Sequence, residues 1–364
     1  MKSIEAQHGL LIERARGIYS FSHLTFQEYF TARQIKEKCS NEALNSLSIH
    51  VTEKRWREVF LLVVEMLPSA EALLQLMKHQ IDSLLAGDEK LQQFFTWVER
   101  KSHSVEASYK PAAVRAFYFT LAVDSSFDYS NTLPVILNNY CGGFDGAFDR
   151  AFASYFASDF NYTSDSILAH AIGSALVVAR YRTRDFGLVR VLDPSLSLAA
   201  LNSALVLDHL LVRYIEGTLI LARHLDVASR SSVEGPIDLD SALALDRYLK
   251  LDSPDTLSRA LDTELQRKLK QLRKQLPDTS NPNWRIFKQW WQANGQGWFS
   301  QLKAVIIHHC DIGHDWQFSN AQNKLLQQYY DANMLLVNCL NSDCYVSREV
   351  RQSIEDALLL RKGS

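Results

Sequence analysis

Residues 17–33 read GIYSFSHLTFQEYFTAR, and this stretch sets the expectation for the fold. The run 18–24 is rich in β-branched and aromatic side chains, which predicts one short strand. From Thr25 the spacing becomes helical, and Glu28 three residues later completes the pattern of a capping box. The apolar residues that follow at helical spacing are Phe26, Tyr29, Phe30 and Ile35. Before the strand, the stretch up to Arg16 is expected to form a short helix.

Helical signals dominate the rest of the chain. Pro68 stops a helix over 53–67, Asp88 opens another, and Pro111 occupies a first helical position. A leucine stripe predicts an amphipathic helix from Ser253 to Pro277; its members are Leu257, Leu261, Leu265, Leu269, Leu272 and Leu276. Further helices are expected after Asn281-Pro282 and after Ser347.

The middle of the chain contains seven Leu-Asp dipeptides without a fixed period, so no solenoid repeat is predicted. Their aspartates are expected on helix surfaces or as caps: Asp193, Asp208, Asp226, Asp240, Asp246, Asp252 and Asp262. We therefore expect an all-α protein in four parts. These are an N-terminal part at 1–50, a helical arm at 51–105, a helical domain at 106–278 and a compact helical module at 279–364.

Composition and charge narrow the function classes. The 364 residues carry a formal charge of −2, from 39 basic and 41 acidic side chains, which gives no global field for nucleic acid or an anionic membrane. The longest stretch without a charged residue, 129–144, has 16 residues, whereas about 20 are needed to span a bilayer. Five cysteines, an odd number, argue against a secreted disulfide framework and favour the cytoplasm.

The N-terminal motif resembles the end of a NACHT module, the nucleotide switch of STAND-class signal-transduction NTPases. The pattern is Phe21-x-His23-x-x-Phe26-Gln27-Glu28-Tyr29-Phe30, and IEAQHGLLIERA upstream and EKRWREVFLLVVEML downstream extend the likeness. The motif is similar to those of bacterial, especially cyanobacterial, NACHT proteins, and the resemblance implies that residues 1–50 are a winged-helix remnant, the end of the winged-helix region of that module. The resemblance implies a partner, the upstream NACHT nucleotide-binding domain, and ATP or ADP as the cofactor of the full-length parent.

The resemblance also implies a role for His23. In the family, a histidine at this position reaches the β-phosphate of bound ADP, and an imidazole is a suitable donor to phosphate oxygen. The alternative is that His23 only packs against the helix beginning at Thr25. No GxxxxGK[ST] or GxGxxG sequence occurs in the chain, so we expect it to bind no cofactor by itself and to hydrolyse no nucleotide.

The segment 305–346 is rich in cysteine and histidine, and it resembles a helical C-terminal module of bacterial NACHT proteins covering about 280–360. A zinc site would use Cys310-x3-His314 with Cys339-x4-Cys344. In the alternative, Cys310 and Cys339 are small buried hydrophobes and His314 bonds the backbone. A thiol enzyme would pair Cys310 with the neighbouring His308 or His309 as base.

A cluster of tryptophans, Trp284, Trp290 and Trp291, follows the basic run 267–274. These rings could form a core, a partner groove or a stacking surface for single-stranded bases, and the basic run is expected to be a solvated helix face rather than a nucleic-acid site.

The resemblance implies a non-catalytic regulatory tail that detects an unknown protein or phage-derived ligand in antiphage defence. The alternatives are a freestanding helical protein- or peptide-binding module, and a zinc- or thiol-dependent enzyme.

Overall fold

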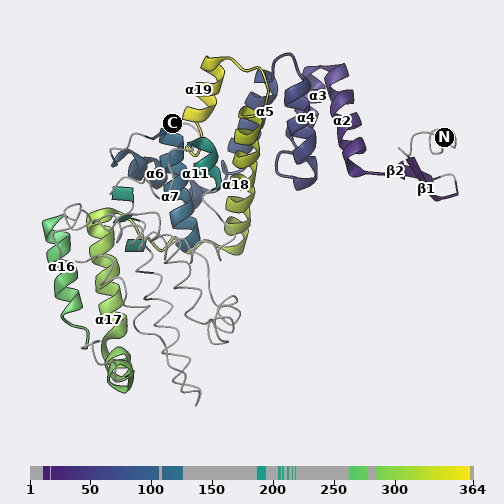
Figure 1. Ribbon diagram of the computed structural model, residues 1–364. Coiled ribbons are helices and arrows are strands. Elements are labelled where there is room, and N and C mark those ends of the chain that lie inside the picture. Colours follow the sequence, from purple (N-terminus) through teal and green to yellow (C-terminus); the bar gives the residue numbers. More distant parts are fainter. Residues whose placement is uncertain are drawn as a thin grey trace, which may run out of the picture.

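The computed structural model describes most of residues 11–125 and 262–360 and a few positions between them. The described residues are 11–16, 18–105, 109–125, 187–193, 204, 205, 207, 208, 211, 212, 215, 218, 262–277 and 284–360. Predictions that fall elsewhere lie outside these residues, among them the part of the expected amphipathic helix from Ser253 to residue 261. Within them the protein is mostly helical, which confirms the all-α prediction (Figure 1).

The chain enters through a hairpin and a helix. Strand β1 (Leu11–Ala15) pairs antiparallel with β2 (Ile18–Phe21), and α2 (Leu24–Lys38) follows. The expected helix up to Arg16 is therefore wrong for residues 11–15, because pairing with the β-branched and aromatic β2 overrides the local helical preference of Glu13. The expected capping box at Thr25 is also wrong. His23 occupies the N-cap, and its side chain makes no capping hydrogen bond.

Six helical segments follow up to the end of α7. They are α3 (Asn41–Ser48), η1 (Lys54–Trp56), α4 (Arg57–Met66), α5 (Glu71–Ser83) and α6 (Glu89–His103), followed by α7 (Pro111–Ser125). The structure confirms three sequence signals in this part of the chain. Helix α4 ends before Pro68, and Pro111 is the first residue of α7. The side chain of Asp88 accepts a hydrogen bond from the backbone amide of Leu91 at the start of α6. Helix α2 packs on α4, so the helical stack begins directly after the hairpin.

The last part of the chain returns to the same core. Helix α18 (Asn320–Leu340) packs against α4, α5 and α11 (Gly187–Leu192), while α19 (Arg348–Asp356) packs against α5 and α7. Arg115 of α7 is buried and donates to the carbonyl oxygens of Leu358 and Asp356, both at 2.7 Å. The four-part division of the chain remains a prediction, but helices from both ends share one hydrophobic core.

A helical pair extends from this core. Helices α16 (Thr263–Arg273) and α17 (Trp284–Cys310) pack on each other, and Figure 1 shows them beside the main stack. Leu265, Leu269 and Leu272 are buried, as the leucine stripe predicts. Residues 311–319 lead from α17 to α18, whose start is a capping box of Ser319 and Gln322.

Candidate functional site

Exposed apolar side chains concentrate on the hairpin and α2. Among the described residues, eight large hydrophobic side chains are exposed, and five of them lie here. They are Ile12 at 38%, Ile18 at 63%, Leu24 at 66%, Tyr29 at 41% and Phe30 at 40% exposed. We call these five residues the N-terminal face. Such a concentration of exposed apolar side chains marks an interaction surface.

Other residues of α2 fix the helix to the core. Ala32 is fully buried, and Ile35 packs against the same cluster. The ring of Phe30 stacks on Phe21 of β2 with centroids 5.7 Å apart, which ties the hairpin to the helix. A two-stranded hairpin has little stability by itself, so this contact helps to hold the hairpin in place.

His23 stands at the edge of the N-terminal face, between β2 and α2. Its side chain is exposed, and its ring lies 6.1 Å from that of Phe26. No acidic residue occupies the first turn of α2, so the positive end of the helix is not neutralised there. An exposed imidazole beside a helix N-terminus can donate to an anion such as a phosphate. His23 is thus exposed and has its ring near the helix, and the role that the resemblance implies for it stays a prediction.

The four proposed zinc ligands fall into two groups. His314 lies five residues before Ser319, and Cys339 lies twenty residues after it along α18. At about 1.5 Å per helical residue and at most about 3.4 Å per extended residue, their Cα atoms are at least about 12 Å apart. Within the described residues, no three His, Cys, Asp or Glu side chains are arranged to hold a metal ion. The structure does not bring the four together.

Each group has other partners. His314 Nε2 lies 2.8 Å from Asp311 Oδ1, a carboxylate rather than the backbone carbonyl that the alternative interpretation expects. Cys344 Sγ donates to the carbonyl oxygen of Cys339 at 3.3 Å. Burial raises the pKa of the Cys339 thiol. Cys339 is therefore a small buried apolar side chain, as the alternative expects.

A thiolate nucleophile is not favoured at Cys310. Burial raises the pKa of this thiol to about 12, and the nearby Asp208 carboxylate adds to the shift. His309 Nδ1 lies 3.3 Å from Asp262 Oδ2, so its ring is directed to the start of α16. A thiol that stays protonated at neutral pH is a weak nucleophile.

The tryptophan cluster is mainly core where it is described. Trp291 is buried, with its ring 6.1 Å from that of Trp298, and Trp290 is half-buried. The indole of Trp298 donates to the carbonyl oxygen of Leu272, which joins α17 to α16. Trp284 begins α17, and its side chain lies outside the described part of the structure.

The sequence interpretation missed a buried charged group. Asp208, expected on a surface or as a cap, is buried, and its Oδ2 lies 2.8 Å from Lys101 Nζ and accepts from the hydroxyl of Tyr118 at 2.7 Å. Burial raises the pKa of Asp208, while Lys101 and Tyr118 oppose that shift. One signal was available: Asp208 interrupts the apolar run ALVLDHLLV at helical spacing.

Comparison with known proteins finds two family matches. Residues 1–35 match the winged helix-turn-helix domain C-terminal to NACHT, and residues 265–361 match NACHT C-terminal helical domain 2. No curated protein and no solved structure matches the chain. None of the helices in the described ranges is both long and apolar enough to cross a bilayer. The two matched families follow a NACHT domain and are not its nucleotide-hydrolysing part, so both ends of this chain support a NACHT C-terminal region.

Proposed function

We propose that this chain is the non-catalytic regulatory and sensor tail of a NACHT signal-transduction NTPase. The N-terminal face carries the proposal: its apolar side chains are exposed, and it lies within or beside the residues that match the winged helix after NACHT. The occupant that we assign to this face is the NACHT nucleotide-binding domain. Docking there would bury Ile18 and Leu24 and bring His23 to the nucleotide.

The mechanism follows from the two kinds of contact that α2 makes. The helix packs on α4, and its exposed side chains contact the nucleotide domain in the proposed complex. ATP or ADP, bound by that domain, supplies the phosphate, and His23 would donate a hydrogen bond to it only in the closed arrangement. A ligand bound by the tail shifts this equilibrium by its different affinity for the closed and open arrangements. The wider setting that we propose is a bacterial, cyanobacterial-type STAND protein in the cytoplasm, which detects a protein or phage-derived ligand in antiphage defence.

The docking test uses the NACHT domain whose reading frame precedes this chain, added as a separate polypeptide. Leu24→Asp should weaken docking at least about tenfold, because a charge would be buried without a partner. Ile49→Asp is the matched control, since Ile49 is 60% exposed but lies outside the N-terminal face. Equal docking of the two variants, measured by titration calorimetry, would show that the N-terminal face is not the docking surface.

The role of His23 is tested in the joined protein. His23→Ala should speed ADP release by about tenfold, the effect of losing one hydrogen bond to a charged group. His79→Ala is the control, because His79 is also exposed but lies on α5. If both variants release a fluorescent ADP analogue at the wild-type rate, His23 only packs against its helix.

A further inference from the structure

The last turns of α6 hold two segments that are far apart in the sequence. Lys101 pairs with Asp208, and the adjacent Arg100 pairs with Asp311, with 2.8 Å between charged atoms in each case. Asp208 belongs to the described positions between 204 and 218, which we call the 204–218 face. Asp311 opens residues 311–319, which we call the 311–319 loop. Neighbouring residues of one helix therefore bind two different parts of the chain.

The pair on the 204–218 face is buried. The side chains of Lys101 and Asp208 are 8% and 7% exposed, and the Lys101 ammonium lies 5.3 Å from the centre of the Tyr118 ring. The buried positions Leu205, Asp208, Val212 and Ile215 recur at spacings of three and four, as expected for one side of a helix. A buried ion pair adds little stability compared with apolar packing, but removing one partner leaves a buried charge without compensation. The buried pair therefore strongly favours the arrangement in which Lys101 and Asp208 are in contact.

The 311–319 loop is held along its length by α6. The indole of Trp97 donates to the carbonyl oxygen of Asp311 at 2.8 Å, and Lys90 Nζ donates to that of Gln317 at 2.7 Å. Trp316 and Phe318 stack with centroids 6.0 Å apart, and both rings contact Phe94. The loop thus lies along about three turns of a single helix.

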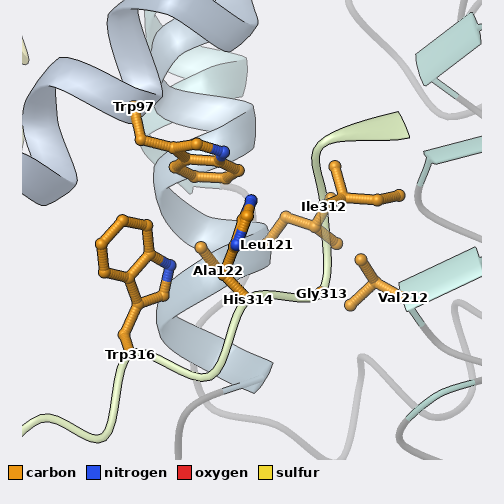
Figure 2. Close-up of a pocket in the computed structure, with 8 residues that line it drawn as sticks. All are labelled: Trp97, Leu121, Ala122, Val212, Ile312, Gly313, His314 and Trp316. Carbon is orange, nitrogen blue, oxygen red and sulfur yellow. The ribbon is translucent and has the colours of Figure 1, made fainter. Parts of the chain in front are cut away.

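The two segments also contact each other. Val212 lines the same small cavity as Ile312, Gly313 and His314, and Figure 2 shows Trp97 and His314 on one side of this group and Ile312 and Val212 on the other. The cavity has room for about one water molecule, so the segments are closely packed. At Gly313 the backbone has φ +78°, and an added Cβ would lie 2.5 Å from Ile215 Cδ1. Displacing one segment would therefore remove packing from the other.

We propose that the end of α6 is a latch: Lys101 and Arg100 hold the 204–218 face and the 311–319 loop closed on the core, and the two segments open together. The buried Lys101–Asp208 pair is the main lock, and the exposed Arg100–Asp311 pair is the weaker one. A signal that displaces either segment would reach α17 on one side and α18 on the other. The latch belongs to this chain alone and does not depend on the nucleotide switch proposed above.

The test measures amide hydrogen exchange of the full chain at neutral pH. Lys101→Met should speed exchange at least about tenfold in peptides covering both 204–218 and 311–319, because Asp208 would lose its counter-charge. Lys78→Met is the matched control: Lys78 is 10% exposed, and its ion pair with Asp82 lies within its own helix. Exchange in α4 should be unchanged in both variants.

Two further variants separate the latch from general destabilisation. The double variant Lys101→Met with Asp208→Leu removes both charges and should restore slow exchange in both segments. Gly313→Ala should open both segments without touching α6, whereas Gly87→Ala should not, because nothing lies within 4 Å of the added methyl group. The proposal is overturned if Lys101→Met opens only one segment, if Lys78→Met opens both, or if the double variant exchanges as fast as Lys101→Met.

Discussion

Two aromatic regions of this protein differ in how fully their rings are buried and surrounded by other rings. Around α6, Phe94 is fully buried, and five rings lie with centroids 5.1 to 5.9 Å from its own: Phe95, Trp97, Phe119, Trp316 and Phe318. On α2, Phe30 is 40% exposed, with ring contacts to Phe21 and Tyr29. The first region has its partners within the chain. The second region has the composition of a core but lacks a covering layer among the described residues.

The largest expected effect compares the same substitution in the two regions. Phe94→Ala should lower the free energy of unfolding by about 3–5 kcal/mol, because it removes a fully buried ring from a packed cluster. Phe30→Ala should cost about 1 kcal/mol or less, since much of that ring already contacts water. Chemical denaturation followed by circular dichroism measures both. Equal losses would mean that α2 is as fully packed as α6.

Thiol reactivity gives the next contrast. Cys39 is exposed at the end of α2, whereas Cys310 lies beside Asp208 and Lys101 with a pKa raised to about 12 by burial. At pH 8 about one molecule in 10⁴ carries the Cys310 thiolate, so its alkylation should be about 10³-fold slower than that of an ordinary thiol. The rate at Cys310 should rise about tenfold per pH unit, and peptide mass spectrometry after iodoacetamide treatment can follow both sites. A fast reaction of Cys310 at pH 8 would show that its thiol is ionised despite its burial.

Sequence patterns predicted the helices better than the contacts between them. Caps at Asp88 and Ser347 and the start at Pro111 are local signals, and the structure confirms them. Residues 11–15 were predicted wrongly because their strand depends on pairing with β2, which local propensity does not report. Asp208 was missed for a similar reason, since its partner Lys101 lies 107 residues earlier and only the folded chain brings the two together.

The candidate sites show the same limit. The exposure of His23 follows from its place between a strand and a helix, which the motif indicates directly. The zinc hypothesis relied on spacing along the chain, and it did not account for the length of α18 between His314 and Cys339. Helix lengths therefore need to be included when ligand spacing is judged.

A smaller effect on stability is expected when the pH is lowered far enough to protonate Asp311. Burial raises the pKa of Asp311, but hydrogen bonds from Arg100 and His314 outweigh it and hold the pKa below its ordinary value. Because the folded pKa is lowered, the contribution to stability is present above about pH 4 and is lost as pH falls through the folded pKa. The loss should be below about 1 kcal/mol, since the side chain is 37% exposed. Amide exchange in the 311–319 loop should quicken below pH 4 relative to Asp311→Asn, which cannot titrate; an equal pH response in both proteins would exclude Asp311 as the cause.

The smallest expected effect is the most informative for the N-terminal face. Ile18→Thr together with Leu24→Gln should change the free energy of unfolding of the chain alone by less than about 0.5 kcal/mol, because both side chains already face water. The same pair of substitutions should weaken docking of a NACHT domain and reduce self-association seen by light scattering, since an apolar patch is removed. A surface that served the fold would lose stability, and a surface kept for a partner would lose only binding. Substantial destabilisation of the chain alone would therefore show that the N-terminal face is already covered from within the chain.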